Sequence, residues 1–212
     1  MNKYTHIIWD WNGTLLDDAA WCIKCVNIML KKRGLPTLDS IEAYHGVFGF
    51  PIIEYYRRVG FDFDKEPFAK LAVEYIELYH DKSCDALLFP DVRDILTYFL
   101  NKGIRQIILS ASELKNLLSQ MAPFGIDSFF DETLGISDIY AAGKIDMGKA
   151  YMERARPERA VLIGDTVHDK ETADALGIDC ILVANGHQGK KDLLSVGAAV
   201  IDSLTDVKNY IK

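Results

Sequence analysis

Short apolar runs that stop at a polar residue recur along this chain. Residues 7–9 form the first run, which ends at Asp10, and similar runs occupy 107–109, 160–163 and 180–183. Continuous apolar runs of this length are typical of strands that are buried on both faces of a sheet. The pattern therefore predicts a parallel sheet in which polar side chains directly follow the strands.

From residue 91 onward, the strands alternate with segments in which apolar residues recur every three or four positions. This alternation predicts βαβ units. Weaker apolar runs at 129–134 and 198–201 are interpreted as further strands, the first of them at a sheet edge. Helix caps are expected at Asp17 or Asp18 and at Ser112. The predicted helical faces span 92–99, 114–121, 147–151 and 168–176.

The first half of the chain has a different pattern. Between Asp18 and about Pro90, apolar residues recur only at helical spacing, and no strand is expected. This segment is interpreted as a helical subdomain that is inserted after the first strand and lies over the end of the sheet. The predicted fold is α/β, with a parallel-sheet core of residues 1–15 and 84–212 and an all-helical cap of residues 16–83.

Composition argues against several classes of partner. The 212 residues are 49% hydrophobic and carry a formal net charge of −7. That charge argues against a nucleic-acid backbone or an anionic membrane surface as the partner. No apolar stretch approaches the length of a membrane span. A small anionic substrate is compatible with the chain if a metal ion or local cations outweigh the overall field.

The four cysteines are Cys22, Cys25, Cys84 and Cys180. The first two have the spacing of a redox or zinc half-site. However, they lie in a helical pattern without a second Cys/His pair, so buried free thiols are expected. Because the chain starts without a signal-peptide pattern, this cysteine usage predicts a cytoplasmic protein. The oligomeric state is not readable from the sequence, and a monomer is favoured.

Asp10, Asn12, Gly13 and Thr14 follow the first strand. Ligands of open α/β sheets bind at the carboxyl ends of the strands, and a glycine lets backbone N–H groups approach an anion. An ordinary Asx turn uses the same residue types. Taken alone, this segment leaves a purely structural role open.

Three later segments also end in a polar group. Ser110 ends the second run, Lys144 follows a glycine, and Asp165 and Asp169 follow the third run. The order Asp, Ser, Lys, Gly-Asp-x-x-x-Asp resembles the haloacid dehalogenase superfamily of phosphatases over essentially the whole chain. The resemblance implies a Rossmann-like core with a helical cap. Residues 46–51, Gly-Val-Phe-Gly-Phe-Pro, are similar to the cap segment of the phosphoglycolate-phosphatase-like subfamily.

The resemblance also implies a role for each residue. Asp10 would be the nucleophile that forms an aspartyl-phosphate, and Thr14 would orient it. Ser110 and Lys144 would hold phosphoryl oxygens, together with the backbone N–H of Ala111.

Acidic residues that converge on one place require a cation, because like charges repel. Hard oxygen ligands beside a phosphate suit Mg²⁺. The resemblance implies that the ligands are a carboxylate oxygen of Asp10, the backbone carbonyl of Asn12 and the side chain of Asp165. Asp169 would be a further ligand or a partner of metal-bound waters.

Some of these roles have structural alternatives. Lys149 lies about one helical turn beyond Lys144, and Ile145 replaces the proline that usually follows the subfamily's lysine. A helix N-cap, or a charge near the positive end of a helix, accounts for Asp165 or Asp169 taken alone.

Asn12 departs from the family pattern, which usually has an aspartate there as general acid and base. An amide cannot deliver a proton at neutral pH, and losing a positioned acid–base group costs roughly 10²–10⁴-fold in rate. Three explanations are open. The protein is a slow phosphatase, or one selective for leaving groups that need no protonation, such as acyl or aryl phosphates. It binds a phosphorylated ligand without turnover. Or deamidation of Asn12, beside Gly13, restores a carboxylate.

The sequence thus predicts a Mg²⁺-dependent hydrolase of a small phosphorylated metabolite, similar to phosphoglycolate phosphatase and acting through Asp10. The alternative is a catalytically weakened homologue that binds a phosphometabolite or a partner protein in a regulatory role. No ligand role is assigned to any of the five histidines. The physiological substrate depends on cap side chains whose direction the sequence does not reveal.

Overall fold

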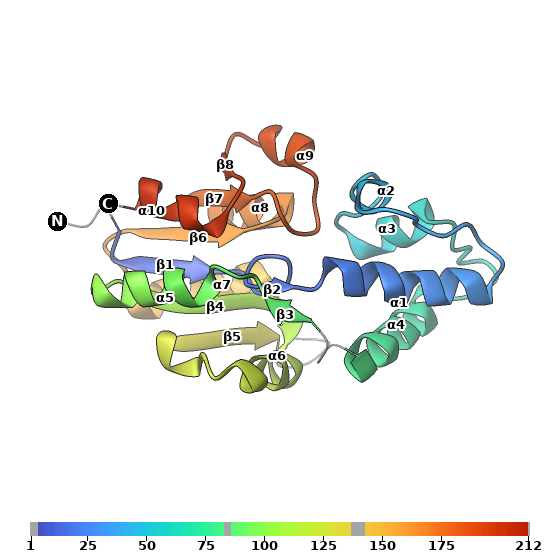
Figure 1. The fold of residues 1–212 in the computed structure, drawn as a ribbon, viewed down its shortest axis with the longest axis horizontal. Helices are drawn as coiled ribbons and strands as arrows, with labels where there is room; N and C mark the ends of the chain where they lie inside the picture. The colour runs from blue at the N-terminus through green and yellow to red at the C-terminus, as the bar shows by residue number, and fades with distance from the viewer. Residues whose placement is uncertain (1–3, 83–85, 137–142, 212) are drawn as a thin grey trace.

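A six-stranded parallel sheet forms the centre of the fold (Figure 1). The computed structural model describes residues 4–82, 86–136 and 143–211. The strands lie in the order β5-β4-β1-β6-β7-β8, and each neighbouring pair is parallel. The strands are β1 (His6–Trp9), β4 (Arg105–Glu113), β5 (Glu132–Ile136), β6 (Ala160–Gly164), β7 (Asp179–Val183) and β8 (Ala199–Ile201).

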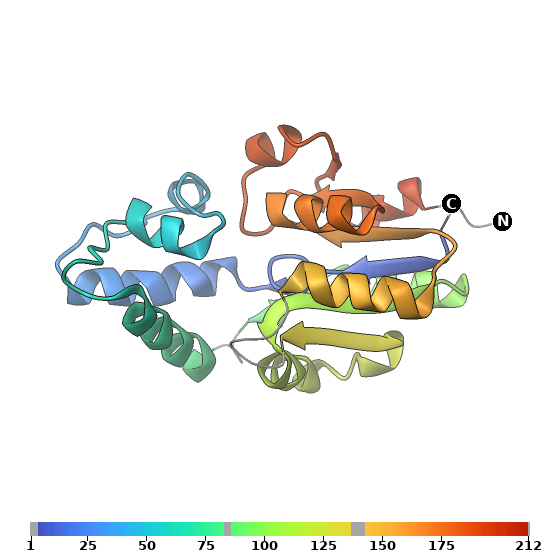
Figure 2. The same cartoon turned by 180° about the vertical axis from the view of Figure 1, so that it is seen from behind.

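Helices cover both faces of this sheet (Figures 1 and 2). On one face lie α5 (Val92–Asn101) and α10 (Val207–Tyr210), and on the other lie α7 (Lys144–Ala155) and α8 (Val167–Leu176). The predicted Rossmann-like α/β core is therefore confirmed. The core also contains α6 (Leu114–Met121), α9 (Lys190–Leu194) and the 3₁₀ helices η2 (Ala122–Phe124), η3 (Asp127–Phe129) and η4 (Leu204–Asp206).

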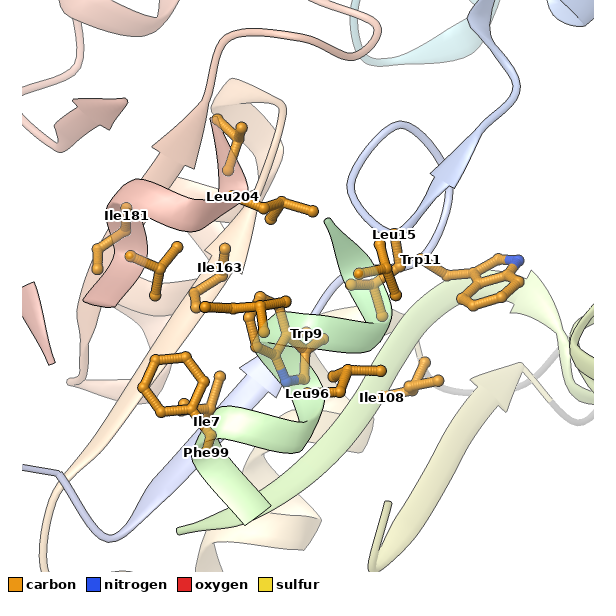
Figure 3. Packing of buried hydrophobic residues seen from close by; sticks show 14 of the residues in the cluster. Ile7, Trp9, Trp11, Leu15, Leu96, Phe99, Ile108, Ile163, Ile181 and Leu204 are labelled. Atoms are coloured by element: carbon orange, nitrogen blue, oxygen red, sulfur yellow. The ribbon is translucent and has the colours of Figure 1, made fainter. Parts of the chain in front are cut away.

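Strand β1 is buried on both sides, as its apolar sequence predicts. Trp9 is completely buried and packs against α5, where its ring centre lies 6.3 Å from that of Phe99 (Figure 3). Its indole Nε1 donates to Gln106 Oε1 at 3.1 Å, so the polar atom of this large side chain has a partner inside the core. Ile8 points to the opposite face and joins a second apolar cluster beneath α7 and α8.

Four helices lie between β1 and the rest of the sheet in sequence. They are α1 (Ala19–Lys32), α2 (Ile41–His45), α3 (Ile52–Arg58) and α4 (Phe68–Lys82). They pack around an apolar cluster of their own, whose residues all fall between positions 19 and 79. We propose that this segment is a cap subdomain with the predicted bounds of 16–83, and we call α1–α4 the cap.

Two short strands connect the cap to the core. β2 (Leu16–Asp17) pairs antiparallel with β3 (Leu87–Leu88). The expectation that no strand lies between residue 18 and about residue 90 is therefore wrong at β3. Two residues are too few to produce a periodic signal, and their pairing with a distant segment makes the strand.

Other local details also differ from the expectations. β5 begins at Glu132 rather than at residue 129, because a 3₁₀ turn occupies Asp127–Phe129. Asp18 occupies the N-cap position of α1, but its side chain makes no capping hydrogen bond. Ser112 is not the cap of α6, whose N-cap position is Glu113. Both side chains bind the Asn12 amide instead.

Cys22 and Cys25 are buried free thiols, as predicted, and Cys180 is a partly buried free thiol. Cys84 lies outside the described residues. Among the described residues, no helix has both the length and the apolar character that crossing a membrane requires.

Candidate active site

The carboxyl ends of the central strands bring the predicted residues together. Asp10 directly follows β1, Ser110 lies in the second half of β4, and Asp165 directly follows β6. β1 lies between β4 and β6, so the strand order reverses at β1. This switch point is where open α/β sheets bind ligands. All three side chains are buried.

Three carboxylates form the centre of the site. Oxygen atoms of Asp10, Asp165 and Asp169 lie within 4.8 Å of one another, and all three residues are buried. Thr14, which is also fully buried, donates from Oγ1 towards Asp10 Oδ2 (3.3 Å) and Asp165 Oδ1 (3.0 Å). We call Asp10, Asp165 and Asp169 the acidic triad.

Lys144 places its ammonium group inside this triad. Its Nζ donates to Asp10 Oδ1 at 2.5 Å and to Asp169 Oδ1 at 2.6 Å, and its side chain is 3% exposed. Because α7 begins at Lys144, the lysine projects from the helix end that faces the site. Lys149 lies on the exposed side of α7. Of the two candidate lysines, Lys144 is the one in the site.

Asp169 also caps the N-terminus of α8. Its Oδ2 accepts hydrogen bonds from the backbone N–H of Thr166 (3.0 Å) and from Thr166 Oγ1 (2.7 Å), which completes a capping box. The helix-start role that was an alternative for Asp169 is therefore real. Because its other oxygen binds Lys144, this aspartate both begins α8 and belongs to the triad.

Burial affects the pKa of each carboxyl group in the triad. It raises the pKa of Asp10 to about 6, against the attraction of Lys144. It also raises the pKa of Asp165 to about 8, against the positive charge of His187. Burial opposes ionisation of Asp169 too, but Lys144 and the Thr166 hydrogen bonds outweigh it and lower that pKa. One ammonium group thus compensates three carboxyl groups incompletely, and a further cation would relieve the remaining repulsion.

A cavity of about 610 Å³ opens over the triad. All of the predicted site residues line it except Thr14, which lies behind Asp10 and Asp165. Ser110 Oγ accepts a hydrogen bond from the backbone N–H of Ser112 at 3.1 Å, and Ala111 is exposed at the cavity surface. The site therefore has carboxylates, a hydroxyl group and an ammonium group along one wall.

The Asn12 amide is held by three partners. Its Nδ2 donates to Asp18 Oδ2 (2.9 Å) and to the Tyr79 hydroxyl (2.8 Å), and its Oδ1 accepts from Ser112 Oγ (2.9 Å). Ser112 and Asp18 thus bind Asn12 instead of capping helices. Tyr79 comes from α4, so the amide also connects the core to the cap.

Asp18 and His187 are site residues that the sequence reasoning missed. His187 Nε2 lies 3.2 Å from Asp18 Oδ1, and His187 Nδ1 lies 2.9 Å from the hydroxyl of Tyr44 in the cap. The backbone N–H of His187 donates to Asp165 Oδ2 at 2.6 Å. Burial opposes the charged imidazole, but Asp18 outweighs it and raises the pKa of His187 to about 9.

A signal for His187 was present in the sequence. It lies four residues after the end of β7, so the rule that located Asp10 and Asp165 also applies to it. The intervening Gly186 is a tight fit, because a Cβ there would lie 2.2 Å from Asp165 Oδ2 and 2.3 Å from the Gly13 carbonyl oxygen. Asp18 has no such signal, because its contacts form only when the chain folds.

A doubly wound parallel sheet with a buried acidic cluster at its switch point, covered by a helical insertion, defines a class of α/β protein that binds its ligand at the carboxyl ends of the strands. Residues 7–183 match the family model described as haloacid dehalogenase-like hydrolase. The chain belongs to the haloacid dehalogenase-like hydrolase family, which confirms the resemblance found in its motifs.

Relatives of known name cover almost the whole chain. A phosphoglycolate phosphatase from Caulobacter vibrioides is 28% identical over 211 residues, covering 95% of this chain and 88% of the relative. The tyrosine-protein kinase PtkA of Mycobacterium tuberculosis is also 28% identical over 211 residues, covering 94% of this chain and 71% of the relative. Among solved structures, the haloacid dehalogenase-like hydrolase SP0104 from Streptococcus pneumoniae superposes with a TM-score of 0.82 at 25% identity and 98% coverage of both chains.

Proposed function

We propose that the protein is a Mg²⁺-dependent phosphatase that hydrolyses a small phosphorylated metabolite, as phosphoglycolate phosphatases do, through an aspartyl-phosphate on Asp10. The observation that carries this proposal is the buried acidic triad with Lys144 inside it, at the carboxyl end of β1. The family and the phosphatases among its relatives support the same reaction class. The alternative of a binder without turnover is not favoured, because those relatives are named as enzymes.

The donor set of the triad fits Mg²⁺. Three carboxyl groups whose oxygens lie within 4.8 Å of one another provide hard oxygen ligands. Asp10 and Asp165 would hold the ion with the backbone carbonyl of Asn12, and Asp169 would bind it or its waters. When bound, Mg²⁺ supplies positive charge beside the phosphoryl oxygens, where the carboxylates would otherwise repel them.

Asp10 would act as the nucleophile. Its carboxylate oxygen forms a bond to phosphorus while the bond from phosphorus to the leaving oxygen breaks. A water molecule then attacks phosphorus, which releases inorganic phosphate and restores the Asp10 carboxylate. Thr14 Oγ1 orients the carboxylate by its hydrogen bond.

Lys144, Ser110 and the backbone N–H of Ala111 would bind the transferring phosphoryl group. The Lys144 ammonium group lies next to the nucleophilic carboxylate, so it can contact a phosphoryl oxygen while Asp10 attacks. The Ser110 hydroxyl faces the same cavity from β4.

The test is phosphate release from 4-nitrophenyl phosphate with Mg²⁺ or with a chelator. We expect release that depends on Mg²⁺ and falls at least about 10³-fold in Asp10→Asn, because the substitution removes the nucleophile and keeps its shape. Asp17→Asn is the matched control, since Asp17 is an exposed carboxylate of β2 outside the cavity. Equal activity of Asp10→Asn and wild type would refute the proposal.

A further inference from the structure

The cavity over the triad has an apolar wall that comes from the cap. Its apolar cap residues include Phe48, Phe50, Ile52, Val73 and Ile76. The volume of about 610 Å³ lies within the range of small-molecule sites. The phosphate end of this cavity is therefore polar, and the cap end is suited to an apolar group.

Helix α4 contributes two side chains to this wall that do not belong to the apolar cluster of the cap. Leu71 and Tyr79 point into the apolar cluster of the cap and are buried. Val73 and Ile76 lie on another face of the helix, three residues apart, and are 59% and 48% exposed. Both line the cavity, so the helix presents aliphatic side chains to whatever enters it.

Phe50 extends this wall from the loop before α3. It is 41% exposed, and its ring stacks on His168 of α8 with ring centres 4.7 Å apart. The apolar wall thus reaches from α4 across to the core. A flat ring that enters here would contact aromatic and aliphatic surface.

The cationic groups of the cavity are already paired. Among the described residues that line it, Lys144 is the only lysine or arginine, and it binds two carboxylates of the triad. His187 is paired with Asp18. The rim adds Glu77 and Glu113, which are exposed. A leaving group that carries a carboxylate, as glycolate does, would meet these carboxylates, and the described lining residues offer it no unpaired lysine or arginine.

Asn12 restricts the leaving group in a second way. Both of its donors and its acceptor are occupied by Asp18, Tyr79 and Ser112, and an amide has no proton to give at neutral pH. A leaving oxygen must therefore depart without protonation from this position. Phenols ionise at a pKa of about 10, as tyrosine does, so a phenolate is a far better leaving group than an alkoxide.

We propose that the substrate is an aryl phosphate, with its ring against Val73, Ile76 and Phe50 and its phosphate on the triad. The inference deepens the proposed phosphatase function and rests on it. Asp10 forms a bond to phosphorus, the bond to the phenolic oxygen breaks, and the phenolate leaves with the electron pair. Solvent water protonates the phenolate, and a second water hydrolyses the aspartyl-phosphate.

An aryl phosphate group occurs both in small phenolic esters and in phosphotyrosine within a protein. The small ester is favoured, because a polypeptide would have to place its backbone on the acidic rim at Glu77 and Glu113. The experiment therefore compares phenyl phosphate with a phosphotyrosine peptide.

The test measures kcat and KM with Mg²⁺ for phenyl phosphate, benzyl phosphate, acetyl phosphate and 2-phosphoglycolate. Because both rings contact the apolar wall, we expect KM to be about tenfold lower for the two ring compounds than for acetyl phosphate. We expect kcat to be at least about tenfold higher for phenyl than for benzyl phosphate, since only benzyl alcohol needs a proton. 2-Phosphoglycolate should have the lowest kcat/KM.

A charge variant tests the wall directly. Val73→Lys should raise kcat/KM for 2-phosphoglycolate relative to phenyl phosphate by about tenfold, because it supplies the cation that the wall lacks. Val73→Gln controls for the loss of apolar surface. Leu100→Lys adds the same charge to a half-exposed leucine of α5 outside the cavity and should leave the ratio unchanged.

The outcomes separate the two proposals. Absence of Mg²⁺-dependent release from every ester would refute the phosphatase function itself. If 2-phosphoglycolate is hydrolysed as efficiently as phenyl phosphate, the aryl assignment is wrong and the phosphatase function stands. Faster hydrolysis of the phosphotyrosine peptide than of phenyl phosphate would refute the small-molecule assignment.

Discussion

Asn12 is the residue at which this site differs from the pattern of its family. The Asn12 amide has a structural role, because it forms hydrogen bonds with Asp18, Tyr79 and Ser112 at the junction of cap and core. The neighbouring Gly13 N–H donates to Asp18 Oδ1 at 2.9 Å and to the Leu16 carbonyl at 2.9 Å. Deamidation needs this nitrogen to attack the Asn12 side chain, and these hydrogen bonds oppose that attack.

Asn12→Asp should increase turnover of alkyl phosphates such as benzyl phosphate by roughly 10²–10⁴-fold. The new carboxyl group would lie beside Asp18, and the two would share a proton, because like charges at this distance cannot both ionise. A protonated carboxyl group is what an alkoxide leaving group requires. Steady-state kinetics on benzyl and phenyl phosphate measure the effect, which should be much smaller for phenyl phosphate.

Asn116→Asp is the matched control, because it adds the same charge to the lining of the same cavity, where the Asn116 amide binds Glu113 and not Asn12. An equal gain in both variants would show that charge, rather than the position of the acid, is responsible. Peptide mass analysis of wild-type protein should find Asn12 unmodified. A deamidated fraction that accounts for the activity would contradict the hydrogen-bond argument.

At the scale of elements, the site depends on how closely the loops after β1, β6 and β7 approach one another. Asp10 and Asp165 follow two adjacent parallel strands, and His187 follows the third. Gly186 lets the last of these loops pass over Asp165 so that the N–H of His187 can bind its carboxylate. The three loops therefore lie so close together that there is no space for a side chain at position 186.

Gly186→Ala should lower phosphatase activity by about 10²-fold, because the added methyl group would displace Asp165 or the Gly13 carbonyl. The cost to stability should be about 1–3 kcal/mol, as expected for overpacking. Kinetics and urea unfolding measure the two effects. Gly143→Ala is the control, since no atom of the described residues lies within 4 Å of its Cβ position and its φ is −64°. Wild-type activity in Gly186→Ala would show that the loop spacing is not needed.

At the scale of the whole molecule, a chain with a net charge of −7 buries three of its carboxyl groups around one lysine. Lys144 is one positive charge among these three carboxyl groups, and the proposed substrate is itself an anion. The proposed reaction therefore requires an added cation, whose binding would be linked to folding. The cap contributes through Tyr44 and Tyr79, which bind His187 and Asp18.

The metal-free protein should become less stable as the pH rises from about 5 to about 8. Folding raises the pKa of Asp10 to about 6 and that of Asp165 to about 8, from 3.8. The folded state thus holds protons that the unfolded chain has lost, and stability falls as these groups ionise. His187, whose pKa folding raises to about 9, acts in the same direction above pH 6.5.

Saturating Mg²⁺ should reduce this slope and add about 2.7 kcal/mol at a concentration one hundred times its Kd. Thermal unfolding with chelator and with Mg²⁺, at several pH values, measures both effects. The variant Asp165→Asn should lose most of the metal-dependent gain. A Tm that does not respond to Mg²⁺ at any pH would contradict the metal site.

The sequence by itself determined the sheet, the end at which the site lies, and the residues Asp10, Ser110, Lys144, Asp165 and Asp169. The first four are next to an apolar run or a glycine, and Asp169 follows Asp165 at the spacing of the Gly-Asp-x-x-x-Asp motif, so local pattern and chain order carry the information. Only the tertiary structure decided what Asp18, Tyr79 and His187 do, and which side chains of α4 face the cavity. Their partners are distant in sequence, as in the contact between Tyr44 and His187, which are 143 residues apart. The periodicity of apolar residues indicates which positions are buried. It does not indicate which distant residues contact each other, because that depends on how the cap and the core pack together.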